Sequence, residues 1–565
     1  MNRIRQERIK KHVESCKFAT IKELHDLFPD VSLMTLHRDL NALEEMGVVT
    51  KYRGGVRSVR QADDLEFNIR MKENNVGKMS MVKKAMKLLK PKSSIFLDAS
   101  TSNLMLARNL PDMELNITTI SPNIAIELCR LKNSTVNLCG GTMNPRTLSV
   151  SGGNTMSILE NINIDLAFIG VSGCSADAGF TCRSTDVNVI YNFDIALRNR
   201  RMVRDYVSTS AQFNHEAQRI GRMPNREIYL FVIGESSRAA NWELYGYSRQ
   251  TNPLLQKRND VLLFKNVITQ SNTTHKSVPL MLSSVDAHEY NTMFYRKGIS
   301  DLFKSVGFYT CFISTQSPQG AMVDNFAMEC DEIVYVEPSE CDMQLLESVQ
   351  RIVENTEREK LFLVLHCYGS HYCYNQRYTE EFAVFLPDDE CAVNNCNRAN
   401  LCNSYDNSIL YTDYFLNEVI ETLCRQMDAC SAMLYCADHG EDLMDNGSKN
   451  FLHSSPKTTY FQTHVAALAW FSPVYSNYFS NKVKAARENA FAPATTHSVF
   501  HTVADMASLR SSYIKYDVSL VNDGFDYSTP RLYVDDHNNA VALDGNVGID
   551  AMQRSLFRRA GVPMP

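Results

Sequence analysis

The stretch EIYLFVIGESSR, residues 227–238, is an apolar run that ends in a carboxylate at Glu235. Four more runs of strand length follow it along the chain: FYTCFIS, LFLVLHCYGSH, SAMLYCADHG and HVAALAWFS. Stretches of helical composition separate these runs, and the alternation predicts a sheet flanked by helices. Ligands bind such sheets beyond the carboxyl ends of the strands. We therefore expect the polar residues that end these runs to share one site.

Three of those polar residues form a candidate metal site. Glu235 ends the first run, and Asp438 and His439 end the fourth. Two oxygens and one nitrogen are three of the four ligands that tetrahedral zinc requires. Thr273 and Thr274 lie in QSNTTHKSVP, before a helix that we expect to begin near Ser277. A hydroxyl at this place is the candidate fourth ligand and nucleophile, because a metal lowers the pKa of a coordinated alcohol.

Two further histidines belong to this candidate site. His371 in YGSHYCYNQRY and His453 in NFLHSSP can hold phosphoryl oxygens or protonate a leaving group. Each signal taken alone has a simpler explanation, since a strand-end Glu is commonly structural and a Thr pair before a helix is commonly a cap. Their occurrence together in one domain favours a catalytic site.

The composition is that of a globular chain with roughly two to four domains. The chain has 565 residues, of which 44% are hydrophobic and 22% are charged. We find no stretch long and apolar enough to span a membrane, and no apolar core follows the basic amino terminus. The sequence therefore predicts a cytoplasmic protein without a transmembrane segment.

The amino terminus is locally basic, although the whole chain carries a net charge of −6. Its pattern predicts helices over residues 5–16, 21–28 and 33–46, followed by a hairpin around 52–56. Ser32 is a plausible N-cap of the third helix, and Leu36, Leu40 and Leu43 form its buried stripe. The opposite face and the hairpin offer candidate DNA contacts, which are Ser32, Thr35, His37, Arg38, Asn41, Arg53 and Arg57. A helical protein-interaction module is the alternative.

The segment SLMTLHRDLNALEEMGVVTKYRGGV, residues 32–56, resembles the winged helix-turn-helix of DeoR-type repressors. The resemblance continues to about residue 182 and implies a partial α/β sugar-phosphate sensor. In DASTSN, residues 98–103, it implies an effector site at Asp98, Ser100 and Thr101 beside a helix N-terminus. The family's closing elements are not found after Cys182, so we expect an incomplete sensor.

The later motifs resemble, in series, the catalytic domain of phosphoethanolamine transferases, in the alkaline phosphatase and sulfatase superfamily. They are GESSRAANWELYGYSRQTNP, SNTTHKSVP, GSHYCYNQRY, NSYDNSILYTDYFL, ADHGEDLMDNG, LHSSP and QTHVAALAW. The resemblance implies an α/β/α sandwich with Zn²⁺ held by Glu235, Thr274, Asp438 and His439. Thr274 is then the nucleophile, and His371 and His453 contact the substrate phosphate. His464 becomes a second-shell residue or a ligand of a second metal.

The implied reaction has two steps. Thr274 takes phosphoethanolamine from phosphatidylethanolamine, and a hydroxyl or phosphate of lipid A or a core sugar then accepts the group. We find no Cys-x-Pro-x-Arg motif, which disfavours sulfate-ester hydrolysis. The alternatives are a soluble phosphodiesterase, or a DNA-binding regulator whose carboxy-terminal domain binds phosphorylated ligands without turnover.

Several positions differ from the pattern of the resembled enzymes. Gln270 and Leu280 stand where those enzymes often have a disulfide, and Thr315 stands where they have Asn. Cys391, Cys396 and Cys402 form a separate cluster, for which disulfides, free thiols and metal binding all remain open.

These observations predict an α/β multidomain chain in which a transferase-type domain is fused to an incomplete regulator. An accidental fusion of two genes is the alternative to a functional two-part protein. The expected segments are a winged helix-turn-helix at 1–60, a partial sensor at 75–182, a connector at 183–226, a catalytic domain at 227–525 and a tail at 526–565.

Overall fold

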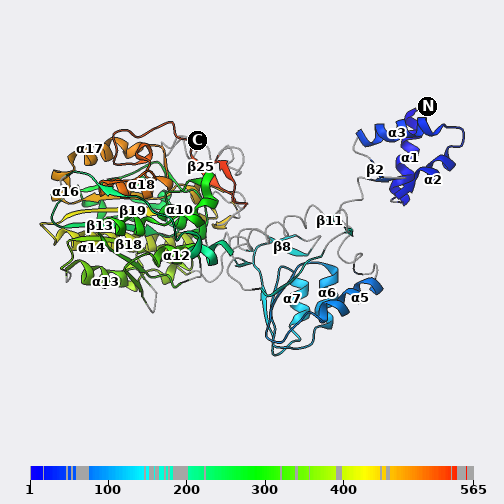
Figure 1. Ribbon diagram of the computed structural model, residues 1–565, viewed down its shortest axis with the longest axis horizontal. Coiled ribbons are helices and arrows are strands. Elements are labelled where there is room, and N and C mark those ends of the chain that lie inside the picture. Colours follow the sequence, from blue (N-terminus) through cyan, green and yellow to red (C-terminus); the bar gives the residue numbers. More distant parts are fainter. Residues whose placement is uncertain are drawn as a thin grey trace. The chain divides into compact units, whose positions relative to one another are not determined.

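The computed structural model divides the chain into two compact units, residues 1–194 and 195–565 (Figure 1). Each unit is described by itself. The structure describes residues 2–16, 18–45, 49–52, 55–58, 71, 75–144, 148–151, 155, 158–159, 164–170, 173–175, 179–181, 201–221, 224–318, 321–336, 341–354, 357–389, 398–445, 448, 450–453, 458–535, 537–543 and 555.

The first unit begins with a winged helix-turn-helix. Its helices are α1 (Asn2–Cys16), α2 (Ile21–Leu27) and α3 (Leu33–Glu45), and its sheet has the order β1 (Phe18–Thr20), β3 (Gly55–Ser58), β2 (Val49–Tyr52). The predicted stripe of α3 is buried, with Leu36 and Leu40 fully covered. The Ser32 hydroxyl accepts a hydrogen bond from the Thr35 amide, as an N-cap does. Strand β1 was not predicted from the sequence.

A parallel sheet follows in the same unit. Its order is β6 (Thr135–Leu138), β5 (Asn116–Thr119), β4 (Ser94–Leu97), β9 (Leu166–Phe168). The helices of this part are α5 (Asn75–Met86), α6 (Thr101–Asn109) and α7 (Pro122–Leu128). Short antiparallel pairs join β7 (Thr142–Asn144) to β8 (Ser149–Ser151) and β10 (Gly173–Ser175) to β11 (Gly179–Thr181).

The second unit is built on a seven-stranded sheet, which confirms the predicted fold class. Its order is β14 (Val261–Leu263), β22 (Ala467–Phe471), β19 (Cys430–Ala437), β13 (Glu227–Gly234), β18 (Lys360–His366), β16 (Tyr309–Ser314), β17 (Glu332–Tyr335). The strands from β19 to β17 are parallel, and β22 runs antiparallel to β19. All five apolar runs of the sequence became strands of this one sheet.

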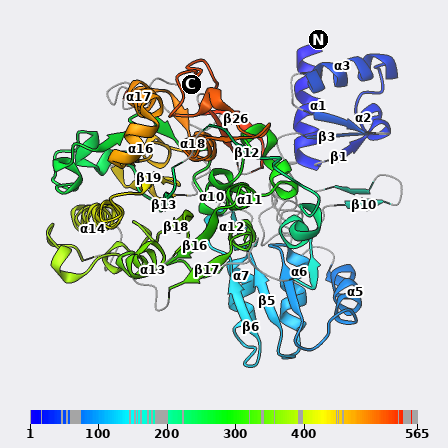
Figure 2. The same cartoon turned by 60° about the vertical axis from the view of Figure 1, so that its left-hand side comes forward.

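Both faces of the sheet are covered by helices, as Figure 2 shows. On β13, Tyr229 and Phe231 belong to one apolar core while Leu230 and Val232 belong to the other, because successive side chains of a strand point to opposite faces. One core includes residues of α10 (Thr274–Leu282), α11 (Ile299–Ser305), α12 (Met322–Ala327), α16 (Pro473–Tyr478) and α18 (His497–Met506). The other includes residues of α13 (Met343–Glu354) and α14 (Arg398–Cys424).

Further short helices and strands of this unit include α15 (Tyr460–Thr463), α17 (Ser480–Glu488), β12 (Gln218–Arg219), β15 (Val267–Ile268), β20 (Asp442–Leu443), β21 (Phe451–Leu452), β23 (Ala494–Thr495), β24 (Leu509–Arg510), β25 (Leu532–Val534) and β26 (Ala540–Ala542). In the described part of the chain, no helix combines the length and the hydropathy needed to cross a bilayer.

Two segments that we expected to lie outside the catalytic domain pack into it. In the expected connector, residues 201–209 are helical, and the buried Tyr206 donates a hydrogen bond to the Arg296 carbonyl at 3.1 Å. In the expected tail, the β25–β26 hairpin hydrogen-bonds the nucleophile segment through Val534 N and Gln270 O at 2.7 Å. Apolar side chains such as Tyr206 and Val534 bury surface on the domain core, which a free linker or tail would leave in water.

Candidate functional site

The candidate metal residues lie at the carboxyl ends of two neighbouring strands. Strands β13 and β19 pair in parallel with Gly234 beside Ala437, so Glu235 and Asp438 leave the sheet side by side. Ligand atoms of Glu235, Asp438 and His439 all lie within 4.8 Å of one another, and all three residues are buried. The structure thus brings together three side chains that are distant in the sequence.

Thr274 joins this cluster from helix α10. Its hydroxyl lies 3.0 Å from His439 Nε2 and 3.1 Å from Glu235 Oε2. The helix begins at Thr274 itself, with Thr273 as N-cap, and not near Ser277 as we expected. This earlier start places the Thr274 hydroxyl at the positive end of the helix dipole, which favours a developing negative charge.

The protonation of His439 follows from its hydrogen bonds. Its Nδ1 lies 3.1 Å from the Gly440 carbonyl, which can only accept a hydrogen bond. In the neutral ring, Nδ1 therefore carries the hydrogen and Nε2 presents a lone pair toward Thr274 and the carboxylates. Such a backbone bond is how proteins fix the tautomer of a metal-binding histidine.

The two carboxylates face each other in a buried place. Burial, and then the charge of Glu235, raises the pKa of Asp438 well above its usual value. In the described part of the chain, the ion pairs join neither carboxylate to a Lys or an Arg. The site therefore has an uncompensated negative charge that a bound cation would neutralise.

Neutral donors hold these carboxylates in place. Asp438 Oδ1 accepts from the amides of Ser236 and His439 at 3.1 and 2.7 Å. Glu235 Oε1 accepts from the Ser236 hydroxyl at 2.7 Å, and Oε2 accepts from Gln316 Nε2 at 3.2 Å. These bonds orient the oxygen atoms without cancelling their charge.

Ser236 and Arg238 of the Glu-Ser-x-Arg motif support the turn after β13. Ser236 has a positive φ of 56°, which turns the chain sharply after Glu235. Arg238 is buried and pairs with Asp445 at 2.7 Å. The turn after β18 packs closely against Glu235, since a Cβ added to Gly369 would lie 2.6 Å from the Glu235 carbonyl oxygen.

His453 and His371 lie next to the cluster. The rings of His453 and His439 have centroids 4.1 Å apart, and those of His453 and His371 are 6.4 Å apart. His453 Nδ1 donates to Glu441 Oε1 at 2.8 Å, and His371 Nδ1 lies 2.6 Å from the Tyr372 carbonyl. Both histidines are partly exposed, and each has its Nδ1 occupied, which leaves Nε2 to contact a substrate.

His464 lies outside this cluster. Its Nδ1 is 3.0 Å from the Tyr460 hydroxyl and its Nε2 is 3.0 Å from the Lys265 carbonyl. Burial lowers its pKa to about 4, so the ring is neutral. Because protein groups engage both ring nitrogens, the structure gives His464 a packing role and leaves no lone pair for a second metal.

Sequence reasoning missed two residues of the site and left a third unexplained. Gln316 contacts Glu235, and Glu441 holds His453; each follows a strand end, in FISTQS and ADHGE, and that position was the available signal. Thr315 is fully buried and donates to Asp342 Oδ1 at 2.8 Å. It supports the strand ends and does not reach the carboxylate cluster.

The candidate DNA contacts gather on α3. His37, Arg38 and Asn41 are exposed there, and Thr35 is partly exposed. Asp39 points inward and pairs with Arg5 of α1. Arg57 belongs to β3, where it pairs with Phe18 of β1, and Arg53 lies outside the described residues.

The candidate effector loop is closed by its own hydrogen bonds. Asp98 Oδ1 accepts from the Ser100 amide at 2.9 Å and from Asn103 Nδ2 at 2.7 Å, and Oδ2 accepts from the Gly170 amide at 2.5 Å. The Ser100 hydroxyl caps α6 by accepting from the Asn103 amide at 3.2 Å, and Thr101 is the buried first residue of that helix. Asp98 therefore serves here to tie the loop together.

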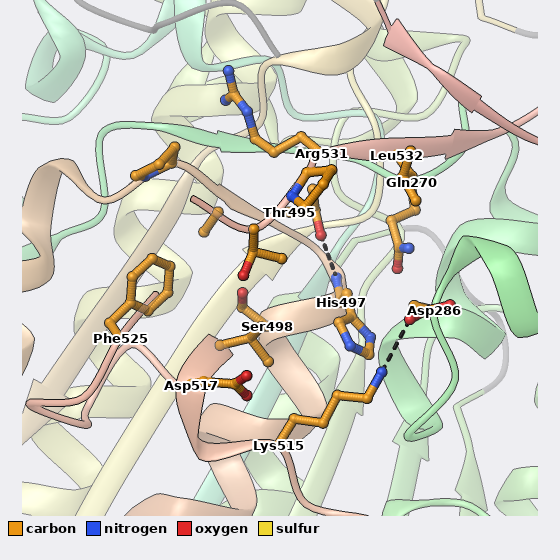
Figure 3. Close-up of a pocket in the computed structure, with 15 residues that line it drawn as sticks. Gln270, Asp286, Thr495, His497, Ser498, Lys515, Asp517, Phe525, Arg531 and Leu532 are labelled. Carbon is orange, nitrogen blue, oxygen red and sulfur yellow. Dashed lines mark hydrogen bonds and ion pairs between the residues drawn. The ribbon is translucent and has the colours of Figure 1, made fainter. Parts of the chain in front are cut away.

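Other features lie apart from the metal cluster. Cys402 is a buried free thiol in α14, while Cys391 and Cys396 lie outside the described residues. Gln270 lines a cavity of about 280 Å³, where Lys515 pairs with Asp286 at 3.0 Å. Figure 3 shows the residues around this cavity. None of the predicted site residues lines this cavity.

Comparisons with known proteins agree with the division of the chain into two units. The model of the family described as Sulfatase matches residues 227–509. The DeoR C terminal sensor domain matches residues 73–201, past residue 182 where we expected the resemblance to end, and the DeoR-like helix-turn-helix domain matches residues 5–62.

Individual relatives match the second unit. The phosphatidylethanolamine transferase Mcr-1 of Escherichia coli is 32% identical over 252 residues, which are 41% of this chain and 46% of that protein. The integral membrane phosphoethanolamine transferase EptA of Neisseria meningitidis is 27% identical, with a TM-score of 0.52, over 60% of this chain and 65% of that chain. The periplasmic domain of Escherichia coli EptC, solved in complex with Zn, shares the fold at 22% identity and a TM-score of 0.52, over 59% of this chain and 98% of that domain.

The chain spans about half the length of the curated relatives that it matches. The likeness to these relatives lies in the unit that holds the carboxylate cluster. Because the family model covers half of the chain, the protein belongs to the sulfatase family, and DeoR-type helix-turn-helix and sensor domains precede its sulfatase domain.

Proposed function

We propose that the second unit is a zinc-dependent phosphoethanolamine transferase that works through a threonine intermediate. The observation that carries this proposal is the convergence of Glu235, Asp438 and His439 on the Thr274 hydroxyl. The similarity to Mcr-1 and EptA supports the phosphoethanolamine group and phosphatidylethanolamine as donor. Lipid A or a core sugar is the proposed acceptor, in keeping with relatives named as lipid A transferases.

The donor set fits a zinc ion. Two carboxylates and an imidazole with a free Nε2 lone pair are ordinary zinc ligands, and the Thr274 hydroxyl supplies the fourth position. The buried charge of the two carboxylates has no Lys or Arg partner among the described ion pairs, so a cation would relieve their repulsion. Zinc in this place would lower the pKa of the Thr274 hydroxyl and stabilise charge on the phosphoryl oxygens.

The protein's own groups account for the proton transfers. In the first step, Thr274 Oγ1 forms a bond to the donor phosphorus while the bond from phosphorus to the diacylglycerol oxygen breaks. The Thr274 hydrogen has an acceptor in the Glu235 carboxylate. His453, oriented by Glu441, and His371 are placed to contact the phosphoryl oxygens and to give a proton to the leaving oxygen. In the second step, the acceptor oxygen attacks the same phosphorus and gives its proton to His371 or His453, while the bond from phosphorus to Thr274 Oγ1 breaks and Thr274 regains its hydrogen from Glu235.

Metal analysis combined with intact mass measurement tests this proposal. The full chain, loaded with zinc and mixed with phosphatidylethanolamine in detergent, should gain the mass of one phosphoethanolamine group. Thr274→Ala should abolish the adduct and keep most of the zinc, because three ligands remain. Thr273→Ala is the matched control and should still be labelled, since the Thr273 side chain makes no cap bond to α10. A labelled Thr274→Ala protein, or an unlabelled wild type, would refute the proposal.

The same assay separates the alternatives. Release of phosphoethanolamine into water at the rate of transfer would indicate a phosphodiesterase. Tight binding of the donor with no adduct and no release would indicate a ligand-sensing domain.

For the first unit we propose DNA binding through α3. The helix presents His37, Arg38 and Asn41 to solvent on one face, and buries Leu36 and Leu40 on the other. The helix-turn-helix match over residues 5–62 supports this assignment. Binding to a sugar phosphate at the Asp98 loop remains part of the proposal, with the amides of α6 as its donors.

A further inference from the structure

We propose that a narrow recess beside Thr274, lined by Phe312, Asp324, Tyr335 and His366, binds the primary ammonium group of the donor's ethanolamine. This inference rests on the proposed transferase function and names the residues that recognise the headgroup. Thr274 and Gln316 line the same recess. A phosphorus atom held for attack at Thr274 would therefore place a short headgroup within reach of it.

Four elements of the second unit build the recess. Phe312 lies on β16 and His366 is the last residue of β18, so both stand near the carboxyl edge of the sheet. Asp324 belongs to α12, and Tyr335 ends β17. The recess is thus framed by the same strand ends that position Glu235, which makes it a continuation of the catalytic site.

His366, which lines the recess, has a buried ring nitrogen whose lone pair is unused. The Ser314 hydroxyl donates to the Gln316 carbonyl at 2.8 Å, so its single hydrogen is used. The 3.2 Å contact between Ser314 Oγ and His366 Nδ1 must then be donated by Nδ1–H. His366 Nε2 is left with a lone pair, and this buried atom has no hydrogen-bond partner among the described residues.

Burial keeps this imidazole neutral. His366 is only 4% exposed, and burial lowers its pKa to about 4. A neutral ring with a bare Nε2 accepts a hydrogen bond and does not repel a cation. An unsatisfied acceptor in a buried place costs about 1 to 3 kcal/mol, so a donor group on a ligand would bind there favourably.

The other lining groups also suit a cation. Asp324 contributes a carboxylate, whose Oδ2 accepts from the Ala321 amide at 3.0 Å and whose Oδ1 lies 3.4 Å from the Tyr335 hydroxyl. Phe312 and Tyr335 contribute aromatic rings, whose faces attract cations. The described residues that line the recess include no Lys or Arg, and His275 is the one other basic side chain beside His366. The lining therefore favours an ammonium group over an anion.

The size of the recess selects among ammonium groups. Its volume is about 10 Å³, which is just enough for one water molecule. A primary ammonium group is close to water in size and can donate three hydrogen bonds. A trimethylammonium group is much larger and has no N–H donor. The recess should therefore accept ethanolamine and exclude choline.

The test compares three lipids on the full, zinc-loaded chain. Phosphatidylethanolamine, phosphatidylcholine and phosphatidylethanol differ only in the group that would enter the recess. The measured quantity is the rate of adduct formation on Thr274, followed by intact mass. Wild type should prefer phosphatidylethanolamine to each of the others by at least about tenfold, the scale of a hydrogen bond to a charged group.

Asp324→Asn removes the charge but keeps an oxygen that can cap α12 through the Ala321 amide. We expect this variant to lose most of the preference for phosphatidylethanolamine over phosphatidylethanol. Asp301→Asn, which removes a carboxylate from α11, is the matched control and should keep the preference. His366→Phe, which deletes the acceptor, should weaken the preference in the same direction as Asp324→Asn.

The outcomes separate this inference from the proposed function. If wild type forms no adduct with any of the lipids, the transferase proposal fails. If wild type forms the adduct but Asp324→Asn keeps the full preference, the recess is not the ammonium site. A second zinc equivalent that is lost in both Asp324→Asn and His366→Phe would show a metal site in the recess and would also overturn the inference.

Discussion

The two units use an aspartate at the end of a parallel strand in opposite ways. In the first unit, Asp98 follows β4 and is surrounded by donors from Ser100, Asn103 and Gly170. In the second unit, Asp438 follows β19 and faces Glu235, a second carboxylate, within the same buried cluster.

The difference shows how to tell a closed loop from a binding site. The donors of the first unit, from the loop after β4, from α6 and from Gly170, surround a single carboxylate and satisfy it. The donors of the second unit orient two like charges toward each other. Such an arrangement is costly unless a cation is bound, because two buried anions repel. The same residue type at the same place in a strand thus has a structural use in one unit and a proposed metal-binding use in the other.

The largest expected effect is on metal binding. Asp438→Asn should weaken zinc binding by at least about 100-fold, since changes even to residues behind metal ligands cost about 10- to 100-fold. Asp98→Asn should leave the zinc content of the full chain unchanged. Zinc per chain, measured after dialysis against a weak chelator, checks both variants. Equal zinc content in Asp438→Asn and wild type would show that Asp438 does not bind metal, and that it does not differ from Asp98 in this respect.

The next effect is on the stability of the first unit. Asp98→Ala leaves the amides of Ser100 and Gly170 without their acceptor, which should lower the free energy of unfolding by about 2 kcal/mol. Calorimetry of the full chain should show this loss in the transition of the first unit alone, because separate units need not unfold together. An unchanged first transition would mean that Asp98 does not hold the loop.

An effect of similar size is expected on the α3 face. Arg38→Ala should weaken DNA binding by about 1 to 3 kcal/mol if the side chain reads a base, and should not affect the adduct on Thr274. Arg108→Ala, which breaks an exposed ion pair with Glu127, is the matched control. Titration of a DNA fragment that the wild type binds, at fixed salt, measures both. No loss in Arg38→Ala would leave α3 as a packing element.

The smallest effect concerns the carboxy-terminal hairpin. The Tyr533 hydroxyl accepts a hydrogen bond from the Asn272 amide at 3.2 Å, two residues before Thr274. Tyr533→Phe should cost about 1 kcal/mol, or roughly a fivefold slower adduct formation, if the hairpin positions the nucleophile. Tyr527→Phe, which alters a hydroxyl bonded to Asn489, is the control. Equal rates in the two variants would show that the hairpin only stabilises the fold.

Much of the fold could be predicted because the pattern of apolar residues in the sequence was strong. The five apolar runs became neighbouring strands of one sheet, and the stripe of Leu36, Leu40 and Leu43 became the buried face of α3. The edge strands β14 and β17 were missed because they are short and only partly buried. We expected a connector at 183–226, outside the catalytic domain, because its charges are dense, yet Tyr206 packs into the core.

The sequence by itself determined which chemistry is available, since carboxylates, histidines and a threonine follow strand ends. Its apolar runs alternate with helical stretches, which is the pattern of a helix-flanked sheet. Only the tertiary structure decided which of them meet. It joined Glu235, Thr274, Asp438 and His439, turned His464 to the Lys265 carbonyl, and brought in Gln316 and Glu441. The physical reason is that strand order and side-chain direction are set by long-range pairing and burial, and local composition does not encode these.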